Sequence, residues 1–274
     1  MDSRFQIGWR PFLPQLITAG VAYTVGAIGA AQLTLPWVGL TWSVVFVVGW
    51  IVALRLRQRQ QFQTHLNVVE LVRDGQFALA GKKLDALCTH PSSIPSHMMF
   101  IYSRAVVFQC MGDFDRALAL YDAILEACGW GPRRVLATHG GLYRARVAEA
   151  YAWAGDLDKA RQLLKRARED GFDGEALILP EAIVALRQGD AQRAVDLLDA
   201  GWPTLEEHRV GHELSPAHLV YALASRGLDG ASDDEREERA HALTPRALAI
   251  TSWAGTRWPE MAEVIKDLQE NAVK

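Results

Sequence analysis

The pattern of apolar and polar residues changes abruptly at Leu54. No charged residue and no histidine occurs from Pro11 to Leu54. A membrane-spanning helix needs about 20 consecutive apolar residues, so this stretch is too long for one span and fits two. Pro36 suits the first turn of a helix and disrupts a helix interior. The pattern therefore predicts a transmembrane helical hairpin over residues 12–54, with helices at about 12–31 and 36–54.

Basic residues flank both ends of this predicted hairpin. The arginines lie in an N-terminal segment, residues 1–11, and in a basic juxtamembrane linker, residues 55–61: Arg4, Arg10, Arg55, Arg57 and Arg59. Cytoplasmic flanks of membrane helices are enriched in arginine and lysine. We therefore expect both termini, and the whole part of the chain that follows the hairpin, on the cytoplasmic side. The alternative for the first segment is a cleaved signal peptide, because Gly29-Ala30-Ala31 is small enough for a cleavage site.

Small residues recur at every fourth position of the first apolar helix, at Ala22, Gly26 and Ala30. Such a spacing lets two helices approach closely in lipid. Packing of the hairpin on itself is the favoured interpretation, and homo-oligomerisation through this face is the alternative. Neither predicted span contains an ionisable group, so nothing there indicates an ion path or a proton relay.

After Leu54 the chain repeats a helical unit. Three copies of one motif stand between helical stretches, at Gly112–Ala117, Gly155–Ala160 and Gly189–Ala194, and Asp74-Gly75 begins a weaker earlier copy. Glycine can end a helix in the left-handed conformation, and the following aspartate can cap the next helix. Gly171, in contrast, is expected in a less constrained loop. The motif predicts paired antiparallel helices, and thus an all-α chain.

This pattern resembles the tetratricopeptide repeat, a helix–turn–helix unit of 34 residues. The likeness covers residues 62–202, and residues 203–274 would form a degenerate repeat and capping helices, including helices at about 215–226 and 259–272. The resemblance implies a concave groove lined by the first helix of each unit. The implied groove residues are Phe62, His65, Val69 and Val72, then Met99, Tyr102, Val106 and Gln109, then Leu142, Ala145, Glu149 and Ala152. Alternatively, part of this strip is core.

Net charge, composition and residue spacing limit the kinds of ligand and reaction expected of this chain. The net charge is −3, which implies no general attraction to nucleic acid, and Cys88, Cys110 and Cys128 form no CxxC pair. Scarce lysine beside arginine, with abundant alanine, is typical of a GC-rich bacterial genome. His208 and His212 are four residues apart but lack an evident third ligand for zinc. The basic stretch at 133–170 indicates a solvated face or contact with anionic lipid headgroups. We find no catalytic motif and expect no cofactor and no metal.

Two functions fit these patterns. The first is a non-catalytic scaffold of the bacterial inner membrane that holds a protein partner, an apolar or amphipathic helix, in its groove. The second is an accessory subunit of a membrane enzyme or transporter, which packs through its transmembrane hairpin.

Overall fold

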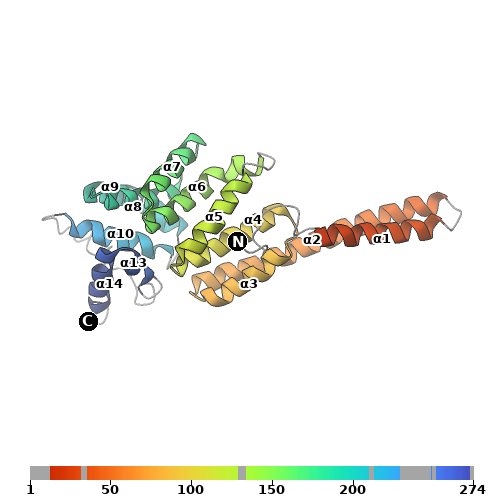
Figure 1. Cartoon of the computed structure of the whole chain (residues 1–274), viewed down its shortest axis with the longest axis horizontal. Coiled ribbons are helices and arrows are strands. Elements are labelled where there is room, and N and C mark those ends of the chain that lie inside the picture. The colour runs from red at the N-terminus through yellow and green to blue at the C-terminus, as the bar shows by residue number, and fades with distance from the viewer. Residues whose placement is uncertain are drawn as a thin grey trace.

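The computed structural model describes residues 13–31, 36–128, 134–209, 213–228, 248 and 251–271 (Figure 1). Every regular element in these ranges is helical, which confirms the predicted all-α class. Helices α1 (Leu13–Ala31) and α2 (Pro36–Arg73) form an antiparallel hairpin that projects from the remaining helices (Figure 1). The predicted residues 1–11, with Arg4 and Arg10, lie outside the described ranges.

The two helices of the hairpin approach each other closely where the indole ring of Trp42 packs against Gly26. A Cβ atom added at Gly26 would lie 2.1 Å from the indole of Trp42, so only glycine admits this approach. Tyr23 also packs edge-on against Phe46, with ring centroids 5.3 Å apart. Ala22 is exposed, and the side chain of Ala30 lies outside the described set. Within the part of the chain that the structure describes, no helix combines the length and apolarity needed to cross a membrane.

Helix α2 does not stop where the apolar stretch ends. Residues 55–61, expected as a linker, are the middle of one continuous helix, so the predicted end of the second helix at Leu54 is wrong. The physical reason is that no glycine or proline interrupts residues 50–74, and Leu, Arg and Gln favour helix. Arg57 and Gln61 donate hydrogen bonds to the His90 carbonyl at 2.9 and 2.6 Å, and these bonds hold α2 against the adjoining loop.

Helix pairs then stack in sequence order. The second half of α2 pairs with α3 (Phe77–Thr89). The later pairs are α4 (Ile94–Cys110) with α5 (Phe114–Cys128), α6 (Arg134–Ala154) with α7 (Leu157–Glu169), and α8 (Ile178–Arg187) with α9 (Ala191–His208). A 3₁₀ turn at Glu175–Leu177 precedes α8. Side chains between the pairs form one continuous apolar core.

The turns between paired helices have the predicted chemistry. The four motif glycines have positive φ angles of 68° to 95°: Gly75, Gly112, Gly155 and Gly189. The carboxylates of Asp156 and Asp190 accept hydrogen bonds from backbone N–H groups three residues later, at 3.1 and 3.0 Å. The expectation for Gly171 is wrong. Its φ is +78°, and it ends α7 with hydrogen bonds to the last turn of that helix.

The C-terminal part returns to the stack. Helix α10 (Ser215–Arg226) and helix α14 (Pro259–Asn271) lie where the sequence predicts helices, and they pack on each other. The short helix α13 (Trp253–Arg257) lies against α6. Trp253 packs edge-on against Phe114 and Trp153, with ring centroids 5.1 Å apart in both pairs. The C-terminal segment therefore covers part of the stack rather than only extending it.

Candidate functional site

A cavity of about 520 Å³ lies between helices α2, α4 and α6 and the segments around Arg209 and Trp253. Its apolar wall is formed by side chains of α2, α4 and α6, among them Val68, Val69, Val72, Met99, Val106 and Leu142. Its polar side contains Arg146, Glu149, Arg209 and Glu213. A cavity of this size, mostly apolar with a few convergent polar groups, is typical of a binding site.

The residues implied by the repeat resemblance converge on this cavity. Of the implied groove residues, these line it together with Val72: His65, Val69, Met99, Tyr102, Val106, Gln109, Leu142 and Glu149. Phe62 lies on the exposed face of α2, with 49% of its surface accessible. Ala145 and Ala152, in contrast, are fully buried in the core. The alternative interpretation, that part of the strip is core, therefore holds for these two alanines.

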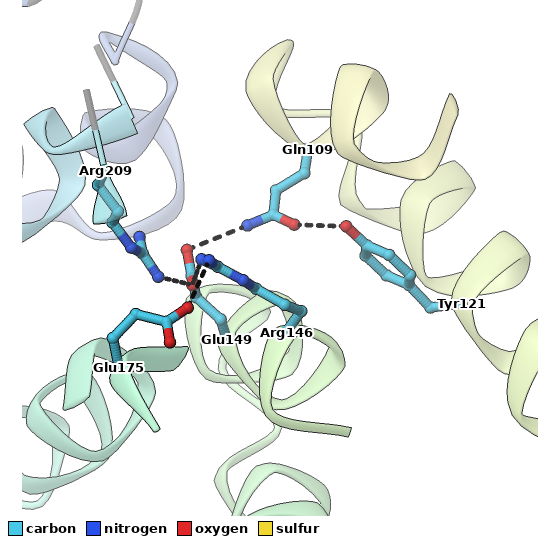
Figure 2. A network of polar contacts seen from close by, with 6 residues as sticks. All are labelled: Gln109, Tyr121, Arg146, Glu149, Glu175 and Arg209. Atoms are coloured by element: carbon cyan, nitrogen blue, oxygen red, sulfur yellow. Dashed lines mark hydrogen bonds and ion pairs between the residues drawn. The ribbon is translucent and has the colours of Figure 1, made fainter. Parts of the chain in front are cut away.

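A buried network of charges forms the polar side (Figure 2). Arg209 donates to a carboxylate oxygen of Glu149 at 2.7 Å, and the side chains are only 4% and 6% exposed. Arg146 lies 3.7 Å from the same oxygen and donates to Glu175 at 3.3 Å. Gln109 donates to the other Glu149 oxygen at 3.4 Å. One carboxylate thus joins α4, α6 and the segment after α9.

Charge pairing outweighs desolvation at the centre of this network. Burial alone would raise the pKa of Glu149, but the guanidinium groups of Arg209 and Arg146 lower it below its ordinary value. The carboxylate therefore stays ionised at neutral pH. Because it holds two cations in a largely dry region, its loss would leave both of them without their shared counterion.

Aromatic side chains form the floor of the cavity. The ring of Tyr102 lies edge-on to Tyr143 and tilted to Tyr121, at centroid separations of 5.1 and 5.9 Å. Tyr121 donates its hydroxyl hydrogen to Gln109 at 2.9 Å. Burial raises the pKa of Tyr102 to about 12 and the pKa of the Cys110 thiol to about 12, so both groups are neutral.

Sequence reasoning missed several residues of the site. Arg146 was grouped with the basic stretch at 133–170, but it belongs to the cavity. Arg209, Glu213, Thr251 and Trp253 come from segments after the recognised repeats. The distance along the chain between Glu149 and Arg209 is 60 residues, and no local pattern connects them.

The other basic side chains of that stretch are mostly paired with acids. Arg144 contacts Asp170, Arg161 contacts Asp158, and Arg168 contacts Glu181. Helix α7, which carries Arg161 and Arg168, lies within the helix stack and not beside the hairpin (Figure 1). This pairing supports the interpretation as a solvated face. In the described ranges no group of three or more metal-ligating side chains occurs, and His212 lies outside those ranges.

Acidification is expected to destabilise the fold partly through His65. Its side chain is 8% exposed, its Nε2 lies 2.7 Å from the hydroxyl of Ser103, and burial lowers its pKa below the ordinary 6.5. The unfolded chain therefore takes up this proton more readily than the folded chain. Neutral His65 makes its full contribution to the free energy of unfolding above pH 6.5. This contribution is lost as the pH falls from 6.5 through the lower pKa of the folded state.

Urea denaturation at several pH values between 7.5 and 5 can measure this effect. We expect His65→Gln to lose less unfolding free energy over that interval than the native chain. All other groups are common to the two proteins, so their contribution cancels in the difference. An identical slope for the two proteins would assign the pH dependence to those other groups.

Comparison with protein-family models, curated proteins and solved structures finds no match to this chain. The tetratricopeptide resemblance therefore stays a prediction.

Proposed function

We propose that this protein is a non-catalytic, membrane-anchored scaffold of the tetratricopeptide type. In this proposal the α1/α2 hairpin is seated in the bilayer, and the cavity holds an apolar or amphipathic helix of a protein partner on the cytoplasmic side. The observation that carries the proposal is the cavity itself, because residues from three successive repeats converge on it.

Exposed apolar side chains support insertion of the hairpin. Large aliphatic residues on both helices are about half exposed or more: Leu16, Ile17, Val21, Val25, Ile28, Val44, Val45, Val47, Val48, Ile51 and Val52. Contiguous apolar surface of this kind marks a membrane or protein contact, since each Å² left in water costs about 25 cal/mol. Because no described helix has the length and apolarity of a span, this surface and the flanking arginines are the support for the anchor.

The continuous helix α2 would hold the cavity clear of the bilayer. At about 1.5 Å per residue, His65 lies roughly 16 Å beyond Leu54 along the helix axis, and Val72 roughly 27 Å beyond it. That distance exceeds the depth of a lipid headgroup layer. The partner in this proposal is therefore bound at the cytoplasmic surface and not within the lipid.

The shape and lining of the cavity favour a helix as the bound element. Apolar side chains of α2, α4 and α6 line one wall, and aromatic rings form the floor. An amphipathic helix places side chains at positions i, i+3, i+4 and i+7 on one face, and a groove between helices accepts such a face.

Photocrosslinking tests the partner site. A photoreactive amino acid at Met99 is expected to capture a partner in membranes, and the same residue at exposed Phe62 is expected to capture none. Tyr102→Glu should reduce crosslinking from Met99 at least about tenfold, because it buries a charge in the binding surface. Phe62→Glu is the matched control on the exposed face.

Circular dichroism must show that Tyr102→Glu remains helical. If this variant unfolds, Tyr102 is core and the groove loses its main support. If it folds and still crosslinks at the native yield, the cavity is not the partner site.

Topology reporters test the anchor. Fusions at Met1 and at Lys274 should both report the cytoplasm, and the protein should stay in the membrane fraction after alkaline extraction. A periplasmic reporter signal at Lys274, or release by alkali, would overturn the proposed anchor.

The alternative, an accessory subunit that packs through its hairpin, is favoured by one observation. Gly26 faces Trp42 within the hairpin, but Ala22 is exposed on α1, where another helix could contact it. Replacing residues 12–54 with an unrelated two-helix anchor distinguishes the two functions. Loss of the partner after this replacement supports the subunit, and retention supports the scaffold.

A further inference from the structure

One carboxylate of the cavity lacks a counterion. Glu213 lines the cavity and is half-buried, and it makes no ion pair or hydrogen bond within the described part of the chain. The arginines beside it are already shared among other carboxylates. Arg209 pairs with Glu149, and Arg146 lies between Glu149 and Glu175. Two positive and three negative groups give this part of the described structure a net charge of −1, so a ligand with one positive charge would balance it.

The negative end of a helix dipole lies at the same place. Gln109 and Cys110, the last two residues of α4, both line the cavity. The last turn of a helix carries partial negative charge, which favours a cation beside it. Burial and, after it, the charge of Glu213 raise the pKa of the Cys110 thiol to about 12, so the Glu213 carboxylate lies close to this helix end. Two sources of negative potential therefore coincide.

The surface around this negative end is mostly apolar. Val68, Val69 and Val72 of α2 and Met99 and Val106 of α4 form the wall of the cavity. An ion pair in such surroundings is stronger than one on an exposed surface, because the effective dielectric constant is lower. The lining thus favours an apolar ligand that carries a single cation. Lysine and arginine meet this requirement, since their aliphatic stems pack on apolar surface while the charged end reaches a polar group.

Resting on the proposed function, we propose that the partner helix carries one lysine or arginine within its apolar face, and that this side chain pairs with Glu213. The apolar residues on either side of it pack on the wall formed by α2 and α4. A partner of this kind differs from other amphipathic helices, because its cation lies in the centre of the apolar face and not along the edges. An acidic residue at that position would be rejected by like-charge repulsion.

Peptide binding to the full chain tests this proposal. The protein is placed in phosphatidylcholine nanodiscs and titrated with fluorescent helical peptides of about four turns, which have blocked termini. Leucine forms the apolar face, glutamine and alanine form the outer face, and one central apolar position carries lysine, acetyl-lysine or glutamate. Acetylation removes the charge of lysine and keeps its aliphatic stem. Fluorescence anisotropy gives the dissociation constants, and empty nanodiscs give the reference for binding to lipid.

We expect the lysine peptide to bind at least about tenfold more tightly than the acetyl-lysine peptide. Glu213→Gln should reduce this preference to less than about threefold, because it removes the counterion. Glu70→Gln is the matched control and should keep the preference, because Glu70 lies on the exposed face of α2, outside the cavity lining. Glu213→Lys should reverse the order, so that the glutamate peptide binds more tightly than the lysine peptide.

Equal binding of the lysine and acetyl-lysine peptides, or a preference that survives Glu213→Gln, would overturn the proposal. In either case the scaffold function stands if Tyr102→Glu still abolishes peptide binding. If no peptide binds but the photoreactive residue at Met99 captures a partner in membranes, the scaffold function stands and this proposal fails. If no peptide binds and calorimetry shows that hexylamine binds in a manner that depends on Glu213, the cavity takes a small organic cation. That result would contradict both the helix partner and this proposal.

Discussion

Replacing Glu149 by glutamine is expected to lower the free energy of unfolding by about 3 kcal/mol or more. Breaking a buried ion pair by removing one member costs about 3–5 kcal/mol, because the other charge stays buried without compensation. Here one carboxylate serves Arg209 at 2.7 Å and Arg146 at 3.7 Å. For a chain of this size the loss corresponds to a fall in Tm of roughly 6–12 °C.

Glu213→Gln is the matched control for this prediction. Glu213 lines the same cavity but is half-buried and has no ion pair among the described residues, so its replacement should cost less than about 0.5 kcal/mol. A double-mutant cycle separates the pair itself. Arg209→Met should cost less in the Glu149→Gln background than in the native chain. Equal costs in both backgrounds would show that the two groups are not coupled.

Gly112→Ala is expected to be the most destabilising of the turn-glycine substitutions. Gly112 has φ +74°, which costs other residues about 1–2 kcal/mol. Its added Cβ would also lie 2.5 Å from the Cβ of Trp253, an atom that cannot rotate away. Overpacking of this kind costs about 1–3 kcal/mol, so we expect a total loss of about 3 kcal/mol.

Gly189→Ala is the control, because φ is +84° there but no atom lies within 4 Å of the added Cβ. It should cost about 1 kcal/mol, from backbone strain alone. Denaturant unfolding of both variants measures the difference. Equal losses would mean that helix α13 does not hold Trp253 against the turn at Gly112.

Local patterns predicted most of the helix pairs. The motif glycines and aspartates act through their own backbone and the next turn, so their chemistry can be recognised without tertiary information. The start of α10 is also a local signal, because Pro216 lies in the first turn of that helix, where proline is favoured. The unbroken α2 was missed because the change in hydropathy at Leu54 was interpreted as a boundary, although helix propensity continues across it.

Only those site residues that occupy equivalent positions in successive helix pairs could be predicted from the sequence. The groove residues from α2, α4 and α6 occupy equivalent positions in successive pairs, so the repeat register places them on one surface. Arg209 and Trp253 lie after the repeats, and their positions depend on how the C-terminal segment folds back. Arg146 occupies a position between the groove positions and reaches the cavity through its long side chain. Such contacts follow from packing and not from spacing.

The unbroken course of α2 makes it a mechanical link. Its 38 residues extend from the apolar hairpin to the cavity wall at Val68, Val69 and Val72. No glycine or proline between Gly49 and Gly75 provides a hinge. A tilt of 10° about Leu54 would displace the end of such a rod by roughly 5 Å, at 1.5 Å of rise per residue. In the proposed anchored state, α2 would therefore transmit a change in hairpin tilt to the helix stack with no hinge to absorb it.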